Sequence, residues 1–538
     1  MRGIALLALA ACANATPVDE PAALQVLPPR KVSAPEVLGE LAGPGAAPAP
    51  PGVLVYGTDM GLSYEHQGQT FIAFGDTWPT AKYICDEHNP HNDDTLARVP
   101  PFDGQLPVLE FLTEPDSAQN ALLIELMRDG ESLTLGYSKT PLTLFSDGTH
   151  VFSTFFRVDV ARCEGATADD PGSCPADEAF ACSTNLGDCR PTTSDFPFLC
   201  DPINNEGCFH PQQCMPVDPG YCYDTSSSQY DGTVRGERFA SVQNIELGMQ
   251  RADDPGVWDS VLVFQTSKFS NQVARTVRRF SGVVEGSDYR TGDDHLLVWG
   301  RPLFVGEEGR EAQLYLLTHE LPLELGDGGT LRWEPRYFAG LDPDNDQPIW
   351  SERQAEAKPL ALDGRVDGDP HEEVSIVQQM TVSWLGPPID QWLMMYGGDD
   401  IDFVLFDREN TRNDSINGSV VVRFADHPWG PWSPPVVHYA PGSPQNAGDP
   451  YGPGGILYHN ECQDMPPQLC ERSDPTRPFE SYLEGCPAPS VQLDIGRLYC
   501  PNVIESYTAP HGDDGLDVYW NISTWNPYSV FLLKTTIR

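Results

Sequence analysis

Residues 57–78 read GTDMGLSYEHQGQTFIAFGDTW, and this stretch decides how the chain is expected to fold. Strand-like runs flank Gln67-Gly68, which is typical of two antiparallel strands joined by a two-residue turn. In that hairpin, Tyr64 faces Phe71 and Asp59 faces Asp76. Directly opposed residues have Cβ atoms about 4.5–5.5 Å apart, so two carboxylates would share one end of the hairpin. A bulge in either strand would break this register.

Two opposed carboxylates need a reason to exist, because like charges facing each other destabilise a sheet. Desolvation and mutual repulsion raise the pKa of one member of such a pair. Glycoside hydrolysis uses this arrangement, since it requires one carboxyl group that holds a proton and one that does not. Asp59 and Asp76 are therefore candidate catalytic acids. A cation site and two independent turn-capping Asp residues remain alternatives.

The rest of the chain predicts an all-β fold. With 51 Pro and 48 Gly, the sequence alternates turns with short runs rich in Val, Ile, Phe, Tyr and Trp. A sandwich, a barrel and a propeller all fit, and the length with scattered hairpins favours a propeller spanning residues 52–538. Residues 121–128 are the clearest helix candidate. The strand-like runs are 53–56, 70–74, 150–158, 260–266, 295–304, 313–317, 380–384, 391–396, 418–424, 517–523 and 528–536.

The N-terminus predicts export and lipid anchoring. A short apolar run from Ile4 to Ala11 has the layout of a signal peptide and is too short to span a bilayer. The sequence Leu9-Ala10-Ala11-Cys12 has the pattern of a bacterial lipobox, so residues 1–12 predict lipidation at Cys12. An ordinary signal peptide with an incidental Cys is the alternative. Residues 13–51, rich in Ala and Pro, predict a disordered tether.

We therefore expect a bacterial envelope protein, on the outer membrane or cell surface, that touches the membrane through its lipid anchor only. No later segment has the 18 continuous apolar residues of a membrane span.

Cysteines are concentrated in one segment. Eight of the 14 lie between Cys163 and Cys222, where strand-like sequence stops, which predicts a disulfide-rich insertion over 163–222. The spacings lack the paired C-x2-C pattern of a zinc site. A second set is odd in number, so one thiol stays free or pairs across sets; its members are Cys85, Cys462, Cys470, Cys486 and Cys500.

The formal charge of −45 disfavours nucleic acid and anionic lipid as partners. A neutral ligand such as a polysaccharide, or a cationic one, fits better, and we expect a monomer. The same charge is equally consistent with a role in solubility alone.

Several motifs resemble the domain-of-unknown-function 4185 family, and the likeness covers about residues 52–538 apart from the insertion. They are GTDMG at 57–61, FGDT at 74–77, YGGD at 396–399, FADHPWGPWS at 424–433 and STWNPYSV at 523–530. The resemblance implies a five-bladed propeller of glycoside hydrolase family 183, whose members are endo-D-arabinanases acting on mycobacterial cell-wall D-arabinan. It also implies that Asp59 and Asp76 are the paired catalytic acids. One departure is Gln379, where relatives often have Glu.

Propeller sites lie at one end of the central channel, so supporting residues can come from distant blades. Candidate substrate-binding acids are Asp94, Asp399 and Glu505. Candidate stacking aromatics are Trp78, Trp525 and Tyr528; the alternatives are an Asp in a Gly-Gly turn and aromatics that fill the core.

No catalytic metal or cofactor is expected. Asp342, Asp344 and Asp346 invite comparison with a calcium loop, but Gln347 and Arg353 stand where an EF-hand needs Gly and Glu. An irregular structural calcium remains an alternative. Two functional rivals also remain: a non-catalytic glycan-binding propeller, and a structural surface lipoprotein whose insertion binds another protein.

Overall fold

The computed structural model describes the chain from Arg30 to Arg538 with gaps. The described residues are 30–43, 45–46, 49–79, 93–128, 131–132, 136–159, 180–182, 189–191, 199–200, 212–214, 220–224, 242–264, 271–277, 295–301, 314–326, 329–343, 347–362, 375–399, 419–439, 498–524 and 529–538. In these ranges the helical elements are two 3-10 turns, η3 (Gln354–Glu356) and η5 (Glu505–Tyr507). No helix formed by these residues is long and apolar enough to cross a bilayer.

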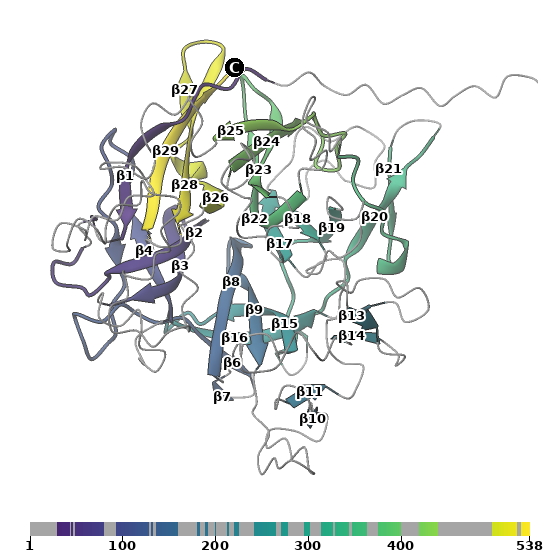
Figure 1. Cartoon of the computed structure of the whole chain (residues 1–538), viewed down its shortest axis with the longest axis horizontal. Coiled ribbons are helices and arrows are strands. Elements are labelled where there is room, and N and C mark those ends of the chain that lie inside the picture. Colours follow the sequence, from purple (N-terminus) through teal and green to yellow (C-terminus); the bar gives the residue numbers. More distant parts are fainter. Residues whose placement is uncertain are drawn as a thin grey trace, which may run out of the picture.

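Five antiparallel sheets follow one another around the molecule (Figure 1). One parallel contact, between β6 and β16, is the exception within them. The strands of each blade are given from inner to outer. The first blade holds β2 (Gly57–His66), β3 (Gln69–Trp78), β4 (Asp93–Val99) and β5 (Glu110–Phe111), and the second holds β8 (Gly136–Ser146), β9 (Val151–Asp159), β15 (Val242–Gln250), β16 (Val257–Phe264), β6 (Glu125–Arg128) and β7 (Glu131–Ser132). The third blade holds β17 (Asn271–Val277), β18 (His295–Arg301), β19 (Tyr315–Glu320), β20 (Arg336–Leu341) and β21 (Pro348–Ser351), and the fourth holds β22 (Ser375–Leu385), β23 (Gln391–Asp399), β24 (Ser419–Ala425) and β25 (Val436–Tyr439).

The fifth blade joins the two ends of the chain. From inner to outer strand it holds β26 (Leu498–Val503), β28 (Gly515–Thr524), β29 (Ser529–Ile537) and β1 (Glu36–Ala42), with β27 (Ala509–His511) paired to β28. The inner strands β2, β8, β17, β22 and β26 each contact the next, and β26 contacts β2, which closes the ring. The chain is therefore a five-bladed β-propeller, and the predicted fold class is confirmed.

Strand β1 corrects one prediction. Residues 13–51 were expected to form a disordered tether, yet Glu36–Ala42 pairs antiparallel with β29 as the outer strand of the fifth blade (Figure 1, purple beside yellow). Glu36 forms an ion pair with Lys534 at 2.8 Å, and Ser529 donates a hydrogen bond to Glu40. The pairing could not be seen in the local sequence, because the partner strand lies almost 500 residues away. The signal peptide and Cys12 lie outside the described residues.

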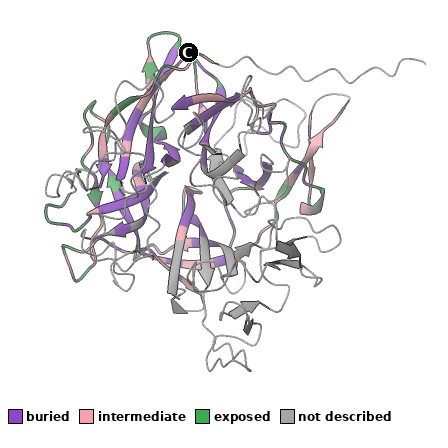
Figure 2. Cartoon of the chain, viewed as in Figure 1, coloured by how far each residue is buried: buried purple, intermediate pink, exposed green. Residues whose placement is uncertain are grey.

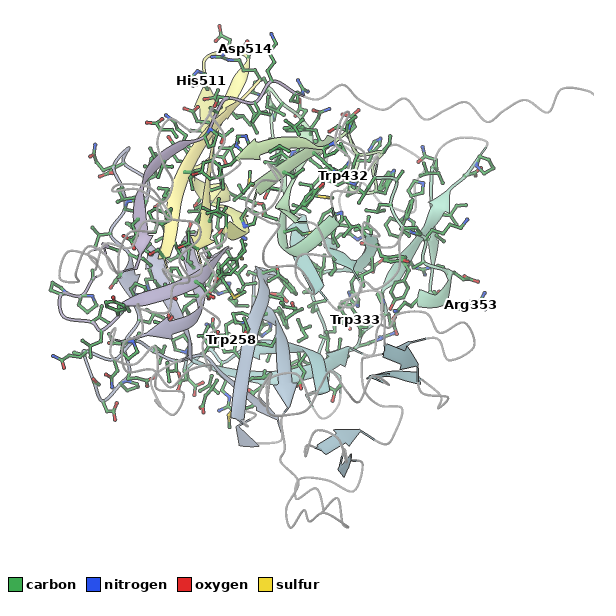
Figure 3. All side chains as sticks on the ribbon, viewed as in Figure 1. Trp258, Trp333, Arg353, Trp432, His511 and Asp514 are labelled. Carbon is green, nitrogen blue, oxygen red and sulfur yellow. The ribbon has the colours of Figure 1, made fainter. Side chains whose placement is uncertain are left out.

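The core consists of apolar clusters within and between the blades, and buried residues line the inner strands (Figure 2). Trp258 in the second blade and Trp432 beside the fourth are fully buried (Figure 3). Trp432 is the aromatic residue of the GPWS motif, and its side chain packs in the core.

The helix predicted over 121–128 is wrong. Ala121 and Leu123 form isolated β-bridges with Thr113 and Thr95, and Glu125–Arg128 is strand β6. Burial explains the error, because Leu122, Ile124 and Leu126 are buried with a period of two, as in a strand.

The segment 163–222 contains two small sheets. One pairs β10 (Phe180–Cys182) with β11 (Cys189–Pro191), and the other holds β12 (Leu199–Cys200), β14 (Gly220–Asp224) and β13 (Gln212–Cys214). The cysteine side chains of this segment lie outside what the structure describes, so their disulfides stay a prediction.

Candidate active site

The two ends of the ring are distinct surfaces. We call the end where the five inner strands begin the start end, and the opposite one the far end. Inner strands run the same way around the ring: Asp59 and Tyr499, near the beginnings of β2 and β26, are hydrogen-bonded, and so are His66 and Ser146, at the ends of β2 and β8. Because strands alternate in direction within a blade, the end of each second strand returns to the start end.

The first hairpin confirms half of its predicted register. Gln67 and Gly68 form the turn with φ of 50° and 77°, and the pairs from His66–Gln69 to Leu62–Ala73 are those predicted. Nearer the start end the register shifts, so Asp59 lies opposite Gly75 and Asp76 is one position further along. The expectation that Asp59 and Asp76 face each other directly is therefore wrong. A bulge is the physical reason.

Asp59 is held in a confined place at the start end. Its side chain is only 8% exposed, and the Tyr499 hydroxyl donates a hydrogen bond to Oδ2 at 2.5 Å. A Cβ added at Gly75 would overlap Asp59 Oδ1 and Met60 Sδ, so glycine leaves room for this carboxylate. Burial, and then the negative charge of Asp59, raise the pKa of the neighbouring Cys500 thiol.

The backbone around this carboxylate is strained. Met60 has a φ of 67° and Cys500 a φ of 54°, both in the left-handed region that side chains with a Cβ rarely adopt. Strand β26 also shifts register between Tyr499 and Asn502. Such strain and bulges concentrate at functional sites, where they re-aim side chains. The two inner strands are thus bent at the residues that flank the Asp59–Tyr499 contact.

A row of threonine hydroxyls fixes the first three strands of this blade. Thr77 on β3 shares hydrogen bonds with Thr58 on β2 at 2.7 Å and with Thr95 on β4 at 2.8 Å, and all three are buried. Each threonine adjoins a predicted site acid in the sequence, namely Asp59, Asp76 and Asp94. The carboxylate of Asp94 is fully buried. The threonine row therefore links β2, β3 and β4 beside the three acids.

Other predicted residues reach the start end by register. Trp78 lies opposite Gly57, and Asp399 lies opposite Ser375. For Asp76, Trp78 and Asp399, as for Gln379, the structure describes the backbone position and not the side chain. Trp525 and Tyr528 lie outside the described residues, between the paired Thr524 and Ser529 of the start end.

Glu505 does not join this group. It is exposed in η5, directly after the end of β26, and therefore lies at the far end. A contact supports this place, because Thr70, at the beginning of β3, donates a hydrogen bond to Ser506 at 2.8 Å. Burial, and then the negative charge of Glu505, raise the pKa of Glu65 near the same end of β2. The structure therefore does not bring Glu505 together with Asp59, because a residue after an inner strand emerges at the opposite end from one near its beginning.

Sequence reasoning missed Tyr499. Its position 440 residues from Asp59 hides the contact, and the only local sign is Pro501 shortly after it, which interrupts a strand ladder. Cys500, from the second cysteine set, is a free buried thiol. Among the described residues, no three His, Cys, Asp or Glu side chains form a metal-binding group, and Asp344 and Asp346 lie outside this part of the chain.

Comparisons with known proteins add little to this geometry. No family model matches the chain, and no curated protein does, so the resemblance to the domain-of-unknown-function 4185 family stays a prediction. A candidate hydrolase from Bacteroides ovatus is similar with a TM-score of 0.37 and 9% identity, over 90% of this chain and 86% of that one. An α-L-arabinofuranosidase from Podospora anserina, in complex with cellotriose, has a TM-score of 0.29 and 9% identity over 94% of this chain and 96% of its own.

A sialidase from Trypanosoma rangeli, solved as a covalent intermediate with 2,3-difluorosialic acid, has a TM-score of 0.32 and 8% identity. The match covers 94% of this chain and 59% of the sialidase. Likenesses this remote carry no argument about function. The propeller assignment rests on the strand order of the chain itself.

Proposed function

We propose that this propeller is a glycoside hydrolase whose active site lies at the start end. The observation that carries the proposal is Asp59, a nearly buried carboxylate held by Tyr499 between two strained inner strands. Asp76 lies one residue beyond the glycine opposite it, and Asp94 is buried on the next strand. Glycosidic bond cleavage needs such a group of acids, with one that protonates the leaving oxygen and one that acts as nucleophile or as base toward water.

The substrate class follows from charge and resemblance. A chain of −45 repels polyanions, so a neutral polysaccharide is the natural partner. Resemblance to glycoside hydrolase family 183 favours D-arabinan, cleaved internally. Export and a lipid at Cys12 would hold the enzyme on the bacterial envelope, close to such a polymer. Gln379 stands where relatives of that family often have Glu, so product analysis also tests the specificity.

The deciding experiment is incubation of the purified protein with arabinans, galactans and other glycans, followed by product analysis. We expect oligosaccharides from D-arabinan with wild-type protein and none with Asp59→Asn. Binding of a glycan without cleavage would instead identify a non-catalytic glycan-binding propeller. If neither occurs, and deletion of 163–222 abolishes capture of a protein partner, the structural lipoprotein would be the correct reading.

Envelope anchoring has a separate experiment. Cys12→Ser should release soluble protein or leave an uncleaved precursor in membrane fractionation. A normally cleaved mutant that stays in the membrane would reject the anchor.

A further inference from the structure

Tyr499 contacts Asp59 from the opposite side of the seam between the first and last blades. Its hydroxyl lies 2.5 Å from Oδ2, the length of a strong hydrogen bond to a charged acceptor. The Tyr499 hydroxyl is the donor of this bond and Asp59 Oδ2 is the acceptor. A donor of this kind stabilises the ionised form of a carboxyl group over its protonated form.

The seam around this contact is tied by side chains. Ser63 donates to Asn502 Oδ1 through its amide at 3.1 Å and through its hydroxyl at 2.7 Å, and Asn521 donates to the Gly61 carbonyl at 2.7 Å. All of these groups are buried. Inner strands β2 and β26 are therefore fixed relative to each other within four residues of Asp59 and three of Tyr499.

The local backbone is bent to make the contact. One extra residue of β26 is accommodated between Tyr499 and Asn502, and Cys500 takes a left-handed conformation there. On the facing strand, Met60 takes the same conformation directly after Asp59. Strain of this kind is unfavourable and persists only where the surroundings enforce it. Two such residues each adjoin one partner of the same hydrogen bond. This indicates that the surrounding fold enforces the Asp59–Tyr499 contact.

We propose that Tyr499 is a positioning residue that holds Asp59 as a hydrogen-bond acceptor, so that Asp59 is the ionised member of the catalytic acids. This inference rests on the proposed function for its catalytic meaning. It divides the roles that the sequence leaves open: Asp59 acts as nucleophile or base, and the group that carries the proton to the leaving oxygen is a second acid of the start end. Asp76 and Asp94, on the two adjacent strands, are the candidates.

The experiment compares Tyr499→Phe with a matched control, Tyr507→Phe. Tyr507 also donates a hydroxyl hydrogen bond, to the Pro100 carbonyl at 2.7 Å, but it belongs to η5 at the far end. Carbon-13 labelling of aspartate carboxyls lets NMR follow the titration of Asp59, identified by the signal that Asp59→Asn removes. Melting curves report on folding of every variant.

In Tyr499→Phe we expect the Asp59 titration midpoint to move to higher pH by about 1 unit, the size of one lost hydrogen bond to a charged group. The acid limb of the pH–activity profile should move with it, and kcat should fall about 10-fold at the wild-type optimum while KM changes little. Tyr507→Phe should leave both quantities unchanged.

An unmoved Asp59 titration in a folded Tyr499→Phe protein would overturn the positioning role. If the Asp59 titration moves in Tyr499→Phe but the wild-type protein cleaves no glycan, the hydrogen-bond role is supported and the proposed hydrolase function is rejected. The NMR and activity measurements thus separate the two failures.

Discussion

The start end and the far end of the propeller are built differently. In the first hairpin the ladder is regular from Leu62 to His66, toward the far end, and shifts twice before Leu62. Register shifts also occur in other inner strands, near the beginning of β22, in the middle of β26, and from the beginning to past the middle of β8. Of the five inner strands, those whose ladders shift are β2 (between Gly57 and Leu62), β8 (between Tyr137 and Thr143), β22 (between Ile376 and Met380) and β26 (between Tyr499 and Asn502), whereas β17 pairs regularly from Asn271 to Val277.

This difference separates scaffold from site. A regular ladder satisfies backbone hydrogen bonds at low cost, and a bulge gives up part of that pairing to turn a side chain. The shifts near the beginning of β2 and within β26 therefore place irregular backbone where Asp59 and Tyr499 meet. Glu505, at the far end, is an exposed residue of a helical turn. Acids at the two ends should consequently respond very differently to substitution.

The largest effect is expected for the acids of the start end. Asp59→Asn and Asp76→Asn should each lower kcat on glycan by about 10³-fold with folding intact, because in the proposed function each removes an acid that acts at the scissile bond. Their combination should lose little more, since groups acting as a unit are disabled by the first substitution. Turnover assays and melting curves of all four proteins measure this.

Glu505→Gln is the matched control at the far end, and it should keep wild-type turnover. Near-normal turnover in either Asp59→Asn or Asp76→Asn would remove the paired-acid mechanism, and a large loss in Glu505→Gln would erase the distinction between the two ends.

The regular part of the molecule could be predicted from sequence, and the irregular part could not. Gln67-Gly68 marks its turn because a glycine, which adopts a positive φ readily, stands between two strand-like runs, so the pairs nearest the turn follow by counting. The shift at Asp59 leaves no mark in residue spacing, since a bulge depends on packing against the neighbouring blade. Tyr499 and β1 were missed for a related reason, because their partners come from the opposite end of the chain.

The propeller fold and part of the candidate site could nonetheless be predicted from the sequence. Motifs that end strands, such as YGGD with Asp399 as its last residue, place acids at strand ends, and blade topology brings those ends together. The same reasoning does not bring Glu505 to the start end, because the sequence shows that Glu505 follows a strand but not that this strand is the inner one of its blade. Direction along the strand decides the end of the ring.

A second effect tests the confined place of Asp59. Gly75→Ala would add a Cβ where Asp59 Oδ1 now lies, and the carboxylate at the tip of a side chain is the group that can move. We expect kcat to fall about 10- to 100-fold, as for a catalytic group misplaced by about 1 Å, with a small change in melting temperature.

Gly397→Ala is the control for that substitution. Gly397 also lies on the second strand of a blade near the start end, and a Cβ there would have no neighbour within 4 Å. Equal activities of the two alanine variants would show that the space beside Asp59 does not matter.

A smaller effect is expected from the threonine row. Thr77→Val keeps the shape of the side chain and removes a hydroxyl that bonds to Thr58 and Thr95. Buried hydroxyls left without this partner cost about 1–3 kcal/mol. Loosening the three strands should also lower kcat by roughly 10-fold, within the range by which misplaced catalytic groups reduce rates.

Thr535→Val separates stability from positioning. Thr535 is buried, bonds to His438 at 2.8 Å and to Trp520 at 3.0 Å, and lies toward the far end. It should lose similar stability and keep its turnover. If chemical denaturation and kinetics showed the same activity loss in both valine variants, the threonine row would have no special relation to the site.

The smallest effect concerns pH and again contrasts two positions. Burial raises the pKa of Glu40, beside Ser529 at the start end, to about 6, and burial lowers the pKa of His438, beside Thr535, to about 4. A raised Glu pKa means that the fold prefers the protonated acid, so this contribution is full below about 4.5 and is lost as pH rises through about 6. A lowered His pKa acts in the opposite sense: the contribution is full above about 6.5 and is lost as pH falls through about 4.

Glu40→Gln should therefore stabilise the protein at pH 7 by about 1–2 kcal/mol, since about 1.4 kcal/mol corresponds to one pKa unit. At pH 4 it should change stability little, because Glu40 is then protonated in both the folded and the unfolded chain. Urea unfolding of wild type and variant at the two pH values measures the difference. The glycan turnover should stay unchanged, because Glu40 belongs to the outer strand β1 and not to the inner strands that carry the acids. A stability gain of equal size at both pH values would mean that its cause is not the ionisation of Glu40 but a change in the packing of β1 against β29.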